Sequence, residues 1–218
     1  MKTLALIVRK PGLSRDAFRE HYEQRHAPLA LPLMSGLVRY VRHHVREELH
    51  GAAGFDVMTA FAYRDRTALD GVIARLASPA GDAVLRDELT FMDKPRNRFF
   101  AVREAAESGA RDRAAERDCI ALVKRAPGQA ASAFAAVFAA RALPALLGTL
   151  PGSHWSLHHE ALASFGEPPY DAVVQLHAGA DSDASLAAWC VTREREGERI
   201  ALVRVSEHET PLPSSGVP

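Results

Sequence analysis

The chain has 218 residues, of which 47% are hydrophobic and 25% charged, as in an ordinary globular protein. Basic and acidic residues number 27 each, so the formal net charge is zero. A balanced charge gives no long-range attraction to nucleic acid or to anionic lipid, and we expect neither as a partner.

The sequence gives no targeting or membrane signal that we can identify. The apolar part of "MKTLALIVRKPG" is short and ends at a basic pair, which favours a first strand over a signal peptide. We find no run of about 18 apolar residues. Cys119 and Cys190 have neither metal-site nor disulfide spacing, so we expect buried thiols in a reduced, cytoplasmic protein.

The first half of the chain predicts six elements in order. "TLALIV" at 3–8 indicates a buried strand, and Pro-Gly follows as a turn. Ser14 is the expected N-cap of a helix that Pro28 would close. Two strands at 37–45 and 55–63 follow, then a helical region at 65–93 and a last strand at 98–102.

The same pattern returns after 116 positions. "RKPGLSRDAFREHYEQRHAP" at 9–28 matches "RAPGQAASAFAAVFAARALP" at 125–144. We therefore predict a duplicated architecture: a first domain at 1–105, a charged linker at 106–117, a degenerate second domain at 118–209 and a flexible tail at 210–218.

Each half reads as an α+β unit of the ferredoxin-like βαββαβ type. Helices on such a unit cover one face of its sheet only, so the other face must be buried elsewhere. Two tandem halves packed sheet to sheet, as an intramolecular dimeric α/β-barrel, would bury both faces.

Candidate site residues come from comparing the two halves. Phe18, Tyr22, His26 and Leu29 share one face of a regular helix. In the second half Tyr22 and His26 become Phe138 and Ala142, which lack their polar atoms. Polar groups private to the first half are candidates for chemistry, although a helix-end histidine can also simply satisfy a terminal carbonyl.

The strand at 37–45 adds Tyr40 and His44, which share one face and whose counterparts are Ser156 and Glu160. Spacing alone leaves open which row of this strand lines a cavity. The segment "RDELTFMD" adds Asp87 and Asp93, acidic groups that could orient a histidine or lie in solvent.

These residues resemble the EthD family of the dimeric α/β-barrel superfamily. The resemblance rests on "RKPGLSRDAFREHYEQRHAPL", "GLVRYVRHHV" and "DELTFMD", and covers about residues 4–105 well and 119–208 weakly. It implies paired ferredoxin-like halves, usually from two chains. It also implies a pocket lined by His26, Tyr22, Tyr40, His44, Asp87 and Asp93, and no second working site at Ala142.

Three functions follow as hypotheses. The first is a small-molecule enzyme without an organic cofactor, performing decarboxylation, dehydration, isomerisation or oxygenation on a hydrophobic or aromatic carbonyl compound. Its catalytic residues would be His26, Tyr22 and Asp87, and Phe18, Tyr40, His44 and Asp93 would bind the substrate.

The second hypothesis is a non-catalytic accessory or ligand-binding protein of an oxidative catabolic pathway. The third is haem or metal binding through the pair His43–His44 or through His154, His158 and His159, which is weakly supported because adjacent strand residues point to opposite faces. We expect no metal and no cofactor, a small-molecule ligand, and leave open a homodimer of the tandem unit.

Overall fold

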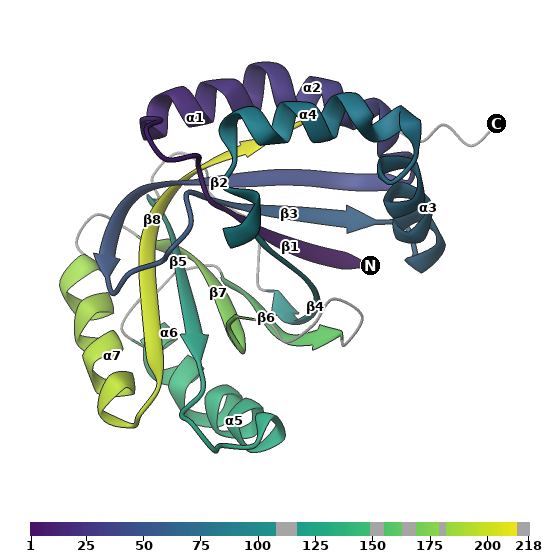
Figure 1. Cartoon of the computed structure of the whole chain (residues 1–218). Helices are drawn as coiled ribbons and strands as arrows, with labels where there is room; N and C mark the ends of the chain where they lie inside the picture. The colour runs from purple at the N-terminus through teal and green to yellow at the C-terminus, as the bar shows by residue number, and fades with distance from the viewer. Residues whose placement is uncertain (108–116, 149–154, 163–168, 179–181, 213–218) are drawn as a thin grey trace. The chain divides into compact units, whose positions relative to one another are not determined.

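A computed structural model of the protein describes residues 1–107, 117–148, 155–162, 169–178 and 182–212 (Figure 1). The chain divides into two compact units. The first comprises Met1–His44, Gly54–Ala101 and Glu207–Pro218, and the second comprises Val45–Ala53 and Val102–Ser206. Strands β2, β4 and β8 contribute residues to both units.

The first unit follows the predicted strand–helix–strand–strand–helix–strand order. Its elements are β1 Lys2–Ile7, α1 Arg15–His21, a π-helical turn Tyr22–His26, α2 Ala27–Ala30, a 3₁₀ turn Leu31–Leu33, β2 Leu37–His50, β3 Val57–Tyr63, α3 Arg66–Leu76, a 3₁₀ turn Pro79–Gly81, α4 Asp82–Phe91, a 3₁₀ turn Lys94–Arg96 and β4 Arg98–Glu107. The strand order β4–β1–β3–β2 is that of a ferredoxin-like unit, with β3 antiparallel to both β1 and β2. Figure 1 shows α1 and α2 following each other along one helical stretch, with α4 beside it, along this sheet.

Local capping explains where the helices of the first unit begin. The Ser14 hydroxyl accepts a hydrogen bond from the Ala17 amide at 3.1 Å, which confirms the predicted N-cap. Asp65 caps α3 in the same way, through the Ala68 amide at 2.8 Å. The helix starts are therefore fixed by short polar side chains, as the sequence indicates.

The end of the first helical stretch differs from our prediction. Pro28 does not close the helix, because a π-helical turn precedes it and Pro28 lies at the start of α2, where a missing N–H is tolerated. The wider turn also shifts the buried face by one residue. Ala30 is fully buried, whereas Leu29, which we placed on that face, is 39% exposed.

The contacts of strand β2 show which of its two rows of side chains faces the helices. Arg42 and His44 hydrogen-bond to Glu23 of the π-helical turn, so the row Tyr40–Arg42–His44 faces the helices. All three side chains are buried. Thr59 of β3 lies on the same face, since its hydroxyl contacts Tyr22.

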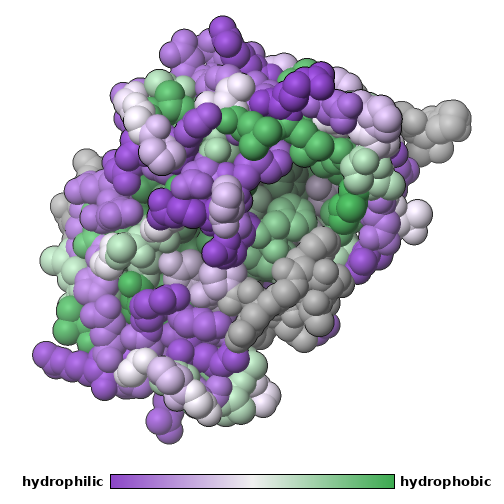
Figure 2. All heavy atoms as spheres, in the orientation of Figure 1, coloured by the Kyte–Doolittle hydropathy of each residue, from purple (hydrophilic) through white to green (hydrophobic). Residues whose placement is uncertain are grey.

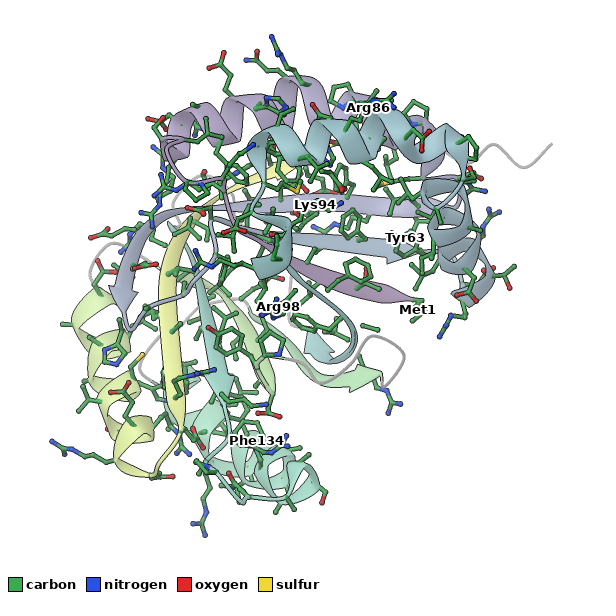
Figure 3. The ribbon with its side chains drawn as sticks, viewed as in Figure 1. Met1, Tyr63, Arg86, Lys94, Arg98 and Phe134 are labelled. Atoms are coloured by element: carbon green, nitrogen blue, oxygen red, sulfur yellow. The ribbon has the colours of Figure 1, made fainter. Side chains whose placement is uncertain are left out.

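The second unit has fewer helices but a related order. Its elements are β5 Arg117–Lys124, α5 Ala131–Val137, a π-helical turn Phe138–Ala142, α6 Leu143–Gly148, β6 Trp155–Leu162, β7 Ala172–Ala178, α7 Asp183–Arg195 and β8 Arg199–Glu209. The strand order is β8–β5–β7–β6, with β5 antiparallel to β7 and β8. The core between this sheet and its helices includes Phe134, Phe138, Leu146, Leu186 and Trp189. Figure 3 labels Phe134 on α5, below β5.

Two local features occur in both units at the displacement that the sequence predicts. The π-helical turns Tyr22–His26 and Phe138–Ala142 are 116 positions apart. The backbone amide of Arg9 donates to Asp56 at 2.9 Å, and that of Arg125 donates to Asp171 at 3.0 Å. The same local geometry is therefore present twice in the chain.

One helical stretch, Ala131–Gly148, is long and apolar enough for a membrane span by length and composition. Our reading of the sequence did not identify it, because Arg141 interrupts it. Its large apolar residues Phe134, Phe138 and Leu146 are buried in the core of the second unit.

Candidate functional site

The π-helical turn of the first unit places three chemically active side chains against the sheet and α4. Tyr22, Glu23 and His26 all lie within this one turn, and the Tyr22 and His26 side chains are buried. A regular α-helix would direct neighbouring residues 22 and 23 about 100° apart. Inserted π turns often occur at functional sites, where they redirect side chains in this way.

Asp87 of α4 binds two imidazoles at once. Its Oδ2 accepts a hydrogen bond from His26 Nδ1 at 2.9 Å, and its Oδ1 accepts one from His21 Nε2 at 2.8 Å. Because an ionised carboxylate only accepts, His26 carries its proton on Nδ1 and its Nε2 has a free lone pair. Arg86, the preceding residue, is exposed and is labelled above α4 in Figure 3, whereas the Asp87 carboxylate contacts the two imidazoles.

His26 is neutral at physiological pH in this setting. Burial lowers the pKa of its imidazole, and the hydrogen bond from Nδ1–H to Asp87 opposes this shift only in part. Phe91 borders the ring at a centroid distance of 5.2 Å. A neutral, oriented imidazole in apolar surroundings is a typical general base.

A second group of polar residues forms around Glu23. The Arg42 guanidinium donates to both Glu23 oxygens at 2.6–3.1 Å, and His44 Nε2 donates to Oε1 at 2.6 Å. Burial opposes ionisation of Glu23, but the hydrogen bonds from His44 and Arg42 dominate and lower its pKa to about 2. Burial lowers the pKa of His44, which is therefore also neutral.

Tyr22 lies between the two imidazoles. Its ring is edge-on to His26 at 5.2 Å and to His44 at 5.9 Å. Its hydroxyl is 3.0 Å from the Thr59 hydroxyl, and burial raises its pKa, so the phenol is protonated. We call the seven residues of this region the polar cluster: His21, Tyr22, Glu23, His26, Arg42, His44 and Asp87.

The structure brings together most of the residues that the sequence selected. His26, Tyr22, Asp87 and His44 lie in the polar cluster, and Tyr40 borders it beneath the Arg42 guanidinium, 4.1 Å from its ring centre. Their catalytic and binding roles stay predictions.

Phe18 and Asp93 lie differently from these residues. Phe18 is a core residue whose ring is tilted against Phe91 at 5.4 Å and lies edge-on to Tyr22 at 6.0 Å. The Asp93 carboxylate lies 3.9 Å from exposed Arg96, and no contact among the described residues joins it to the cluster.

Our reading of the sequence missed Glu23, Arg42 and His21. On a regular helix Glu23 lies to one side of the row Phe18–Tyr22–His26, so the comparison of that face did not include it. Arg42 did carry a usable signal, since it is a charged residue between Val41 and Val45 in a strand expected to be covered on both faces.

The equivalent turn of the second unit has no such chemistry. Phe138 and Ala142 pack in an apolar core, and Trp189 donates its indole N–H to the Ala142 carbonyl at 3.0 Å. His154 and the side chains of His158 and His159 lie outside the described part of the structure. Within the described residues, no group of three or more His, Cys, Asp or Glu side chains could hold a metal ion.

The surface of the first unit is hollowed beside this region. Figure 2 shows a hollow below α4, over β1 and β3, with hydrophobic residues along its rim. Leu85 and Leu89 of α4 are 38% and 59% exposed. Aromatic rings of the sheet follow one another, with Tyr40 near Phe61 at 5.1 Å and Phe61 near Tyr63 at 6.2 Å. Figure 3 labels Tyr63 beside Met1, whose amino group donates to the Tyr63 carbonyl at 2.6 Å.

Comparisons with known proteins concern the domain family and the fold. Residues 10–95 match the family model of the EthD domain. Among solved structures, a putative monooxygenase from Fusobacterium nucleatum subsp. nucleatum is similar, with 9% identity and a TM-score of 0.52, over 96% of this chain and 93% of that one. A putative chlorite dismutase is similar with 12% identity and a TM-score of 0.50, over 94% of each chain. A variant of chlorite dismutase from Candidatus Nitrospira defluvii has 12% identity and a TM-score of 0.50, over 94% and 90%. At these identities the likeness concerns the fold, and no curated protein matches the sequence.

Proposed function

We propose, from the match of residues 10–95 to the EthD domain model, that the protein is a small-molecule enzyme that performs acid–base chemistry without an organic cofactor. The substrate would be a hydrophobic or aromatic carbonyl compound. His26 would accept a proton at Nε2, and Asp87 would orient the imidazole from Nδ1.

The observation that carries the proposal is the His26–Asp87 pair. A buried imidazole whose Nδ1–H donates to a carboxylate at 2.9 Å has one tautomer and one free lone pair. Abstraction of a proton next to a carbonyl needs such a base, and it is a common step of dehydration and isomerisation. Decarboxylation forms the same enolate by loss of CO₂, and there the protonated imidazole would return a proton to the carbon. The second unit, with Ala142 in the position of His26, would act as a structural partner.

The aromatic surroundings support an aromatic or otherwise hydrophobic substrate. Phe91 and Tyr22 border the His26 ring, and Tyr40, Phe61 and Tyr63 continue along the sheet. Pockets of this composition take up apolar ligands, while a few polar atoms fix their orientation.

Hydrogen–deuterium exchange at carbon tests the proposal without a known product. The protein is incubated in D₂O with a panel of hydroxyaryl ketones and β-keto acids, and loss of the signal of the proton next to the carbonyl is followed by NMR. We expect at least one compound to exchange, and His26→Ala to slow that exchange about 10²-fold or more.

His50→Ala is the matched control, since His50 is a half-buried histidine of the second unit that pairs with Glu194 at 3.1 Å. It should retain the full rate. Equal rates in the wild type and His26→Ala would refute the assignment. A retained small molecule in native mass spectra, without exchange or turnover, would instead favour the accessory ligand-binding function.

A further inference from the structure

The last residues of β8 lie against the polar cluster, although they come from the far end of the chain. We call Glu207–Thr210 the C-terminal segment. The Thr210 amide donates to the Tyr40 carbonyl at 3.1 Å, and its hydroxyl accepts from Arg42 Nη2 at 2.7 Å. Glu209 accepts two hydrogen bonds from Arg39 at 3.0 and 3.2 Å. Hydrogen bonds therefore join the C-terminal segment to three residues of β2, which are Arg39, Tyr40 and Arg42.

The same segment reaches the carboxylate at the centre of the cluster. His208 Nε2 lies 3.2 Å from Glu23 Oε2, the oxygen that also accepts from Arg42. Glu23 and Arg42 are therefore held between the π-helical turn and the C-terminal segment. The EthD match ends at residue 95, so the C-terminal segment lies outside the matched residues, whereas its partners Glu23, Tyr40 and Arg42 lie within them.

Glu23 in turn orients His44 in the way that Asp87 orients His26. The His44 Nε2–H donates to Glu23 at 2.6 Å, which leaves Nδ1 as the free acceptor. His44 Nδ1 is buried and has no hydrogen-bond partner among the described residues. An unsatisfied buried polar atom is energetically costly, so the contacts around His44 must hold the ring in this orientation. His44 and His26 border the same Tyr22 ring.

We propose that the C-terminal segment is a positioning element of the candidate site and that, through Arg42 and Glu23, it fixes His44 as a second proton-accepting group beside Tyr22. The catalytic meaning of this inference rests on the proposed function. The geometry that it claims is testable on the protein alone.

The groups facing His44 come from three elements. Glu23 and Tyr22 approach from the π-helical turn and Arg42 from its own strand, with the charge of Arg19 acting from α1. His208 approaches Glu23 from the C-terminal segment. Removing the contacts of that segment should admit water, relieve the burial that lowers the His44 pKa, and raise that pKa.

Imidazole ¹⁵N NMR titration of the full chain tests the inference. In the double variant His208→Ala/Thr210→Val we expect the His44 pKa to rise by about half a unit or more, and the fixed tautomer to be lost. The His26 pKa should stay unchanged, because Asp87 holds that ring. Thr210→Val alone should shift His44 in the same direction, and Thr210→Ser, which keeps the hydroxyl, should restore wild-type behaviour.

Asp70→Asn is the control, since the Asp70 carboxylate pairs with exposed Arg66 on α3 and belongs neither to the C-terminal segment nor to the polar cluster. It should leave both imidazoles unchanged. If the His44 pKa is unchanged in both Thr210→Val and His208→Ala/Thr210→Val, the inference is wrong, whatever the result of the hydrogen–deuterium exchange assay. If the wild type catalyses hydrogen–deuterium exchange at carbon, the double variant should slow that exchange about tenfold while the His26 titration stays unchanged. An unaltered exchange rate would limit the C-terminal segment to a structural role and would overturn its proposed part in catalysis.

Discussion

The guanidinium of Arg42 and the carboxylate of Glu23 form an ion pair in the interior of the first unit. Arg42 Nη2 lies 2.6 Å from Glu23 Oε2, and the two side chains are 1% and 13% exposed. Removing two charges from water is costly, and their attraction offsets that cost only when the hydrogen bonds around them are complete. His44 and Thr210 complete them here.

Loss of either charge should therefore be far more harmful than loss of a surface pair. We expect Glu23→Gln to lower the free energy of unfolding by about 3–5 kcal/mol, because it leaves the Arg42 charge buried and uncompensated. Urea unfolding measures this. The control is Asp70→Asn, which removes the exposed pair Arg66–Asp70 and should cost less than about 0.5 kcal/mol. Similar losses in both variants would contradict the desolvation argument.

The free energy of unfolding should depend on pH through Glu23. The Glu23 pKa is about 2 in the folded protein, against 4.5 for its ordinary value. A lowered carboxyl pKa contributes stability above the unfolded pKa, and that contribution is lost as the pH falls from about 5 to 2. The shift corresponds to about 3 kcal/mol. Unfolding free energies measured at pH 7, 4 and 3 should show this loss, and Glu23→Gln should remove Glu23's share of the slope.

The sequence predicts a residue of the polar cluster only where its place follows from a regular helix or strand. The comparison of the two halves selects His26, Tyr22 and His44 because their counterparts lose the same polar atoms. It does not select Glu23, because on a regular helix residue 23 lies about 100° from Tyr22 and outside the row Phe18–Tyr22–His26. The Glu23 carboxylate joins the cluster through Arg42 and His44 of β2, and local propensity does not contain these tertiary contacts.

The pairing of the strands is a second feature that the sequence does not predict. Alternation on β2 groups Tyr40 with His44, but which face meets the helices depends on the register with β3. The contacts of His208 and Thr210 with the cluster span more than 160 positions, so only the tertiary structure joins them to Glu23 and Arg42. The α+β class and the order of elements in the first unit, by contrast, follow from short apolar runs and caps and are confirmed.

Asp87 should control the ionisation of His26. Its hydrogen bond and its charge both raise the His26 pKa against the effect of burial. We therefore expect Asp87→Asn to lower that pKa further and to release His21 as well, which donates to the other oxygen. Imidazole ¹⁵N NMR measures both rings. Asp82→Asn, an acidic residue exposed in the first turn of α4, is the control and should change neither titration. A raised His26 pKa in Asp87→Asn would refute this assignment.

Tyr22 and Phe138 allow a reciprocal exchange between the equivalent turns. Tyr22→Phe removes the hydroxyl that contacts Thr59 at 3.0 Å but keeps the ring between the imidazoles, so we expect a loss of about 1 kcal/mol in unfolding free energy. Phe138→Tyr instead adds a hydroxyl to the apolar core around Trp189 and should cost more, about 2–4 kcal/mol, because the new group lacks both space and a partner. Urea unfolding of the two variants compares these costs. The rate of hydrogen–deuterium exchange at carbon in Tyr22→Phe then tests the predicted catalytic role of Tyr22. If the Tyr22 hydroxyl donates a hydrogen bond to the substrate oxygen, its loss should slow exchange about 10²-fold or more, whereas a packing role leaves the rate nearly unchanged.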